Sequence, residues 1–212
     1  METKGIQWCF FVVGLMILAF GIALTIEARE LGISPWDVLH YGLYMNFGLT
    51  VGSWSIIVGM IIVTFTCIVT KSGPQIGTIL NMVFIGLFID LFLLLLPTPS
   101  SLWVMAPMFI IGVAFSALGI GVYVASGLGA GPRDGLMLYL TKKTGWKVQW
   151  VRNVIEVNIL ILGWMLGGPV GIGTLLIALL LGNFIGYSLP LTKNFMTFLI
   201  NRGMNGENFY KG

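Results

Sequence analysis

Four carboxylates are the residues of this chain whose type and setting could do chemistry. Asp37 and Asp134 occupy the same place in two similar segments, G-I-S-P-W-D-V-L and G-A-G-P-R-D-G-L, while Asp90 and Glu156 lie inside long apolar stretches. A charged side chain in hydrocarbon is costly, so such residues normally face a polar interior. We therefore take these four as candidate contacts for a solute or a proton pathway.

Each of these carboxylates also has a structural interpretation. Asp37 and Asp134 fall at the third position of expected helices, where a carboxylate caps free N–H groups, and we favour this role for them. Glu156 follows Arg152 by four residues and can pair with it. Asp90 has no partner nearby in the sequence; its alternative to a coupling role is a hydrogen bond to a neighbouring helix.

The similarity between the two aspartate segments continues along the chain. Further matches follow at nearly the same offset: Gly48 with Gly145, Val51 with Val148, Gly73-Pro74 with Gly168-Pro169, and Ile76-Gly77-Thr78 with Ile172-Gly173-Thr174. We therefore expect a duplicated unit, with residues 1–97 as the first repeat and 98–190 as the second. Residues 191–212 would form a short cytoplasmic tail.

Composition places the chain in a membrane. Of its residues 57% are hydrophobic and only 9% are charged, and the mean hydropathy is +0.97. A soluble domain of this length could not cover so much apolar surface. The net charge of +3 is no sign of nucleic-acid binding, because the membrane orientation explains where the cations lie.

Six apolar segments separated by Pro, Gly and charged residues are long enough to cross a bilayer. They are Gly5–Ile26, Val51–Thr70, Gln75–Leu96, Leu102–Ala125, Val148–Leu166 and Val170–Leu189. Three spans per repeat mean that the second repeat is inserted upside down. The expected fold is an all-α, polytopic bundle of two inverted three-helix repeats.

The basic residues predict the orientation of this bundle. Nine of them fall on one side of the expected spans: Lys4, Lys71, Arg133, Lys142, Lys143, Lys147, Lys193, Arg202 and Lys211. The opposite side holds only Arg29, because Arg152 lies within a span. The positive-inside rule then places both termini in the cytoplasm.

Each repeat also contains a short helix, expected at Pro35–Phe47 and Pro132–Thr144. At 1.5 Å per residue each is roughly 20 Å long, too short to span a bilayer. Ser34 and Gly131 are the expected N-caps, and Gly48 and Gly145 the expected ends. The segments are either interfacial amphipathic helices or re-entrant half-helices that line a solute site, and both alternatives stay open.

Sequence motifs of several common enzyme classes are absent from the chain. The chain has no phosphate-binding Gly loop, zinc-protease motif, C-x-x-C pair or nucleophile elbow, so we expect no enzyme activity, no catalytic residues, no cofactor and no metal. Cys9 and Cys67 both lie in apolar spans and make no disulfide framework. We expect no nucleic-acid partner.

The segments S-P-W-D-V-L, G-L-G-A-G-P-R-D-G-L-M and G-P-V-G-I-G-T together resemble those of the bacterial YczE proteins, in a loose YczE/YyaS/YitT group of small integral membrane proteins. The resemblance covers nearly the whole chain. It implies a multi-pass protein of the bacterial inner membrane. It carries no catalytic or ligand residue over to this chain.

These observations favour a secondary transporter, or a transporter subunit, for an unknown small solute. A channel with paired half-helices is one alternative. Another is an accessory or scaffold protein that binds a cytoplasmic partner through the tail and the basic loop Arg133–Lys147, which contains Lys142 and Lys143. Beyond the lipid bilayer and the solute, the expected partners are a second copy of the chain, since a bundle of this size can dimerise, or another protein.

Overall fold

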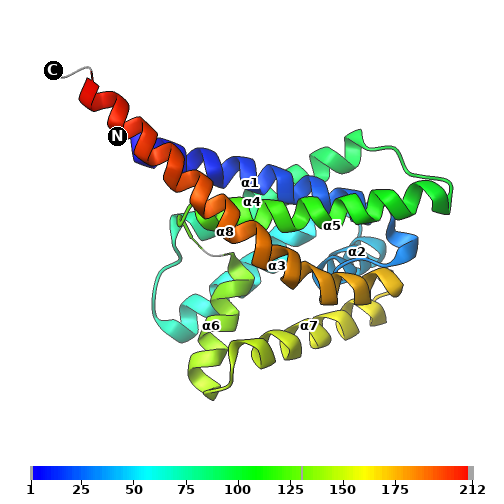
Figure 1. The fold of residues 1–212 in the computed structure, drawn as a ribbon. Helices are drawn as coiled ribbons and strands as arrows, with labels where there is room; N and C mark the ends of the chain where they lie inside the picture. Colours follow the sequence, from blue (N-terminus) through cyan, green and yellow to red (C-terminus); the bar gives the residue numbers. More distant parts are fainter. Residues whose placement is uncertain (1, 130, 210–212) are drawn as a thin grey trace.

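The structure, a computed structural model, describes the backbone of residues 2–129 and 131–209 and the side chains of 3–129 and 131–201. Within these residues the fold is all-helical (Figure 1). The elements are α1 (Glu2–Glu27), the short 3-10 helix η1 (Arg29–Leu31), α2 (Pro35–Phe47), α3 (Val51–Thr70), α4 (Ile76–Leu95), α5 (Leu102–Ala125), α6 (Pro132–Thr144), α7 (Val148–Met165) and α8 (Ile172–Phe209).

Five helices of the described chain are long and apolar enough to cross a membrane. They are α1, α3, α4, α5 and α8. The segment predicted as the fifth of six spans does form a helix, α7, but it is not among these five. Arg152, Asn153, Glu156 and Asn158 lower its hydropathy. The structure therefore supports a multi-pass helical membrane protein and leaves the count of six spans unconfirmed.

The last helix is longer than the sequence pattern suggested. α8 continues through Pro190 to Phe209, past the predicted start of the tail at residue 191. Hydroxyl groups on either side of the proline hold this part of α8 against α5: Ser188 donates to the carbonyl of Ala117 (2.7 Å) and Thr192 to that of Gly121 (2.9 Å). These contacts fix α8 to α5 on both sides of the position where proline donates no backbone hydrogen bond.

The two short helices have the predicted bounds and the predicted ends. The Ser34 hydroxyl accepts a hydrogen bond from the Asp37 amide (3.4 Å), and the Asp134 carboxylate accepts one from the Gly131 amide (3.2 Å). Gly48 and Gly145 end the helices, both with φ of 72°. A positive φ is costly for residues with a Cβ, which explains glycine at both stops.

The centre of the bundle is the crossing of α1 and α5. Glycines bring the two backbones together: a Cβ at Gly21 would lie 2.4 Å from the amide nitrogen of Ser116, and one at Gly119 would lie 2.3 Å from that of Leu18. Phe11, Leu15 and Ala19 of α1 are completely buried. Small residues allow this close packing in membranes, where lipid is as apolar as a protein core.

The other helices pack around this pair in a regular arrangement. α4 packs on α1 and α8 on α5; α2 packs on α3 and α7, and α6 on α7 and α3. α3 also packs closely on α4, whereas α7 and α8 form no comparable pair among the described residues. The start of α1 and the far part of α8 lie at the same end of the molecule (Figure 1), where the Phe10 and Phe195 rings meet.

Candidate functional site

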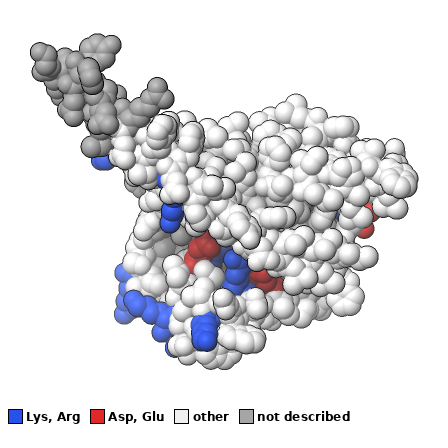
Figure 2. Space-filling view, in the orientation of Figure 1, with Lys and Arg blue, Asp and Glu red and all other residues white. Residues whose placement is uncertain are grey.

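A cavity of about 470 Å³ lies between the two halves of the chain, and all eight α-helices or their starting loops contribute to its lining. In the space-filling view, acidic and basic side chains gather in a hollow between α8 and α7 (Figure 2). Its volume is in the range that small-molecule sites have. Charged groups inside an otherwise apolar bundle mark this cavity as the candidate site.

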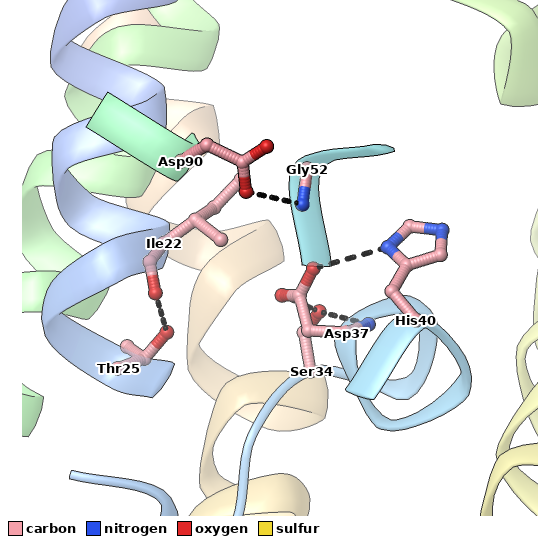
Figure 3. Close-up of polar contacts among 7 residues, drawn as sticks. All are labelled: Ile22, Thr25, Ser34, Asp37, His40, Gly52 and Asp90. Carbon is pink, nitrogen blue, oxygen red and sulfur yellow. Dashed lines mark hydrogen bonds and ion pairs between the residues drawn. The ribbon is translucent and has the colours of Figure 1, made fainter. Parts of the chain in front are cut away.

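The start of α2 supplies one wall of the cavity. Asp37 is 2% exposed; one oxygen of its carboxylate accepts a hydrogen bond from the Ser34 hydroxyl, and the other lies 3.8 Å from Nδ1 of His40 (Figure 3). That second oxygen has no hydrogen bond within the described chain. The Ser34 hydroxyl thus caps the helix, and the Asp37 carboxylate supports it by accepting the hydroxyl proton, while its other oxygen stays unpaired.

The start of α6 supplies the facing wall. The Arg133 guanidinium lies over the Trp36 ring of α2, 4.5 Å from its centroid, so the first turns of the two short helices meet directly. In the part of the chain that the structure describes, Arg133 makes no hydrogen bond or ion pair. This cation–π contact holds the guanidinium at the cavity while its N–H groups stay unpaired.

The third charged wall belongs to α7. Arg152 and Glu156 line the cavity and pair with each other at 2.8 Å between Nε and Oε1, as their spacing predicted. Asn153 lies beside them on the cavity. Because the pair is internally neutralised, it adds polarity to the site without adding net charge.

Apolar and amide groups complete the lining. Leu18 and Ile22 of α1 and Val113 and Ile120 of α5 form an aliphatic wall. Asn81 of α4 is 3% exposed, and its Nδ2 has no hydrogen-bond partner among the described residues. The cavity therefore combines a hydrophobic side with unpaired donors and acceptors.

Burial changes the ionisation of groups on the two short helices. Burial raises the pKa of Asp134, while the Gly131 N–H and the charges of Arg133 and Arg152 oppose the rise. Burial also lowers the pKa of His40, despite its contact with Asp37, so the imidazole is neutral near pH 7. Arg133 stays charged, because the guanidinium pKa is too high for burial to remove its proton.

Asp90 is the one candidate carboxylate that the structure places away from the cavity. One oxygen accepts a hydrogen bond from the Gly52 amide (2.8 Å; Figure 3). The other accepts one from the Thr50 hydroxyl (2.5 Å), so both donors lie at the start of α3. Gly52 in turn packs against α4 so closely that a Cβ there would lie 2.0 Å from the Gly86 carbonyl oxygen. Asp90 thus fastens α3 to α4 through the neighbouring-helix hydrogen bonds considered as the alternative.

Replacing Asp90 tests this fastening role. Asp90→Leu leaves the Gly52 amide and Thr50 hydroxyl without their charged acceptor, and hydrogen bonds to charged groups contribute about 1.5–3 kcal/mol each. We expect a clear drop in the melting temperature of the purified protein in detergent, a smaller drop for Asp90→Asn, and none for the exposed-site control Glu30→Gln. A melting temperature for Asp90→Leu equal to that of the parent would contradict the assignment.

Most of the other site residues predicted from the sequence lie on the cavity. Asp37, Asp134 and Glu156 all lie on the cavity. Arg133, grouped with Lys142 and Lys143 as a structural or partner contact, also lies on the cavity, whereas the two lysines are exposed. Trp36 and Asn81 also line the cavity but were not among the sequence-based candidates. The position of Trp36 directly before Asp37 is the signal that could have identified it.

The fold and the site define a multi-pass helical membrane protein with a charged internal cavity. Residues 5–190 match the model of a family described as "Family of unknown function (DUF6198)", and the chain belongs to this family. It is a YczE-like protein, as its motifs suggested.

The chain is similar to curated proteins over most of their length. The chain is 52% identical over 197 residues to the uncharacterized membrane protein YczE of Bacillus subtilis, covering 93% of this chain and 92% of the relative. It is 30% identical over 190 residues to YyaS of the same organism (88% and 94% covered). An uncharacterized protein of Haemophilus influenzae is 33% identical over 177 residues (84% and 80%). No solved structure matches the chain.

Proposed function

We propose that this protein is a secondary transporter that binds a small solute between two inverted repeats. The observation that carries the proposal is the meeting of α2 and α6. Each begins in one of the two similar segments, and both place their first turn, with Asp37 and Asp134, on the same cavity. Short helices that point their starts at a site between repeats are typical of transporter folds.

The packing supports two equivalent halves. The pairs α1–α4 and α5–α8 correspond, as do α2–α7 and α6–α3. The same holds for single residues: a Cβ at Gly77 would lie 2.1 Å from the Leu128 carbonyl oxygen, and one at the matching Gly173 would lie 2.7 Å from that of Leu31. These are the same contacts made once by each half against the other, as a two-fold relation requires.

The pairs α3–α4 and α7–α8 match in the two repeats but are packed differently. This difference supports a transport cycle. α3 is closed on α4 through Gly52, Gly86 and Asp90, while the matching helices α7 and α8 are apart and the cavity opens between them. On α8, Gly182 matches Gly86. A Cβ at Gly182 would have no neighbouring atom of the described residues within 4 Å. In the second state the halves exchange roles: α7 closes on α8, and α3 leaves α4.

The closed pair and the open pair lie at opposite ends of the bundle. Gly52 and Asp90 are at the start of α3 and the end of α4. The opening instead lies near the start of α7, beside exposed Lys142 and Lys143. With the orientation that the positive-inside rule predicts, the present state is open towards the cytoplasm and closed by the Asp90 contact on the outer side.

Accessibility of the cavity from both sides tests this proposal. In a background without Cys9 and Cys67, we would place a cysteine at Ser116, a buried position on the cavity, and label it with a membrane-impermeant thiol reagent. We expect reaction from the cytoplasmic side and, more slowly, from the outside. Ile110→Cys, on the same helix but 65% exposed on its apolar face, should react from neither side.

Other outcomes of the labelling would identify the alternatives. If Ser116→Cys reacted only from the cytoplasm under all conditions, the cavity would be a pocket and not a transport path. Equal and simultaneous reaction from both sides would instead support a continuous channel. The scaffold alternative included Arg133 as a contact for a cytoplasmic partner. Because Arg133 lines the cavity, this residue does not favour that alternative.

A further inference from the structure

The composition of the cavity points to the chemical class of its ligand. The identity of this ligand rests on the proposed transport function, but the inference concerns only what the cavity binds. Three features bear on it: the unpaired guanidinium of Arg133, the carboxylates of the two short helices, and the aliphatic wall from α1 and α5.

The first feature requires an anionic group. Arg133 is half-buried and lies over the Trp36 ring, yet it has no carboxylate or carbonyl partner within the described chain. A guanidinium positioned in this way is suited to a carboxylate or a similar planar oxyanion. The unpaired Nδ2 of the buried Asn81 is a further donor on the same cavity.

The second feature requires a cationic group. Asp134 uses one oxygen to accept the Gly131 N–H, which leaves the other oxygen for a ligand, and Asp37 has an unpaired oxygen as well. A purely anionic solute would therefore lie close to two carboxylates that make no ion pair with an arginine or lysine of the described chain. A purely cationic one would leave Arg133 without a counter-ion.

The balance of charge leads to the same conclusion. With Arg152 and Glu156 neutralising each other, the site keeps one positive side chain, Arg133, and two negative ones, Asp37 and Asp134. Each helix start adds roughly half a positive charge. The cavity is thus close to neutral overall but contains separated charges of both signs.

We propose that the cavity binds a small zwitterion that carries an apolar group. Its anionic group is held by Arg133, its cationic group by Asp134 and Asp37, and its apolar part lies against Leu18, Ile22 and Val113. Asp37 belongs to the first repeat, and Arg133 and Asp134 belong to the second, so the solute bridges the interface that moves during the proposed transport.

A matched set of six compounds tests this assignment on the purified full-length protein. Two zwitterions, leucine and phenylalanine, are compared with their deaminated forms, 4-methylpentanoate and 3-phenylpropanoate, and their decarboxylated forms, 3-methylbutylamine and 2-phenylethylamine. Binding is measured by calorimetry and by protection of Ser116→Cys from the thiol reagent. At least one zwitterion should bind at least about tenfold more tightly than both of its analogues, since each lost charge leaves a buried partner unpaired.

Substitutions at one position confirm where the anionic group lies. Arg133→Gln should weaken zwitterion binding at least about tenfold, and Arg133→Lys less, because lysine keeps the charge without the planar fork. The exposed cation Lys142, on the same helix, provides the control Lys142→Gln, which should bind as the parent does. Size-exclusion chromatography verifies that each variant is folded.

Three results would overturn the assignment. The carboxylate analogue binding as tightly as its zwitterion would make this an anion site, and the amine doing so would make it a cation site. If none of the six compounds binds to a protein whose Ser116→Cys is labelled from both sides, the ligand class is wrong while the transport proposal stands. Failure of the two-sided labelling would instead remove the transport proposal itself.

Discussion

Gly21→Leu should abolish the folded protein. Gly21 lies at the crossing of α1 and α5, where a Cβ would come within 2.4 Å of the Ser116 amide nitrogen and 2.6 Å of the Gly112 carbonyl oxygen. Both neighbours are backbone atoms, so no side-chain rotation can relieve the overlap. Overpacking typically costs about 1–3 kcal/mol, and here it separates the central helix pair, so we expect a cost above that range.

The measurement is size-exclusion chromatography of the protein extracted in a mild detergent. Gly21→Leu should give only aggregate or no detectable protein, and Gly21→Ala a strongly reduced folded peak. The matched control is Gly186→Ala on α8, where a Cβ meets nothing within 4 Å, and which should behave as the parent does. A monodisperse Gly21→Leu protein with the parent's melting temperature would show that the α1–α5 crossing is not as described.

Gly182→Leu should preserve the fold and stop the proposed transport cycle. The position is open in the present state, so a larger side chain is tolerated there. In the proposed second state, α7 packs on this part of α8 as α3 packs on Gly86 now. The new side chain then blocks the approach and holds the protein in the state that is open between α7 and α8.

Labelling of Ser116→Cys in the Gly182→Leu background measures this effect. Reaction from the cytoplasmic side should persist at the parental rate or above it, while reaction from the outside should fall at least about tenfold, the change that a shift of 1.4 kcal/mol between the two states produces. The variant should elute and melt as the parent does. Undiminished labelling from the outside would contradict the closure of α7 on α8.

Local signals in the sequence predict the two short helices well. The ends of α2 and α6 depend on residues close in the chain: a serine or glycine cap, a proline in the first turn, an aspartate two residues after it, and a terminal glycine. Capping is a short-range interaction, so its residues can be recognised without knowing the fold. The apolar character of the long helices is likewise visible in composition alone.

Contacts between distant parts of the chain could not be predicted in this way. Asp90 appeared isolated because its partners, Thr50 and Gly52, lie 40 and 38 residues away. Arg133 appeared to belong to a basic loop because three lysines follow it, but the approach of α6 to α2 places its guanidinium on Trp36. The end of the last helix was also missed, since hydroxyl bonds to α5 support α8 on both sides of Pro190.

A spin-label distance measurement between α7 and α8 tests whether these two helices approach and separate. Labels at Trp150→Cys and Phe184→Cys, both exposed positions, report the separation of these helices, while Met16→Cys with Leu118→Cys reports the fixed α1–α5 pair. We expect two distance populations for the α7–α8 pair, only the longer one in Gly182→Leu, and a single unchanged distance for the control pair. One narrow population for α7 and α8, identical in the parent and in Gly182→Leu, would contradict a transporter in which the two halves exchange conformations.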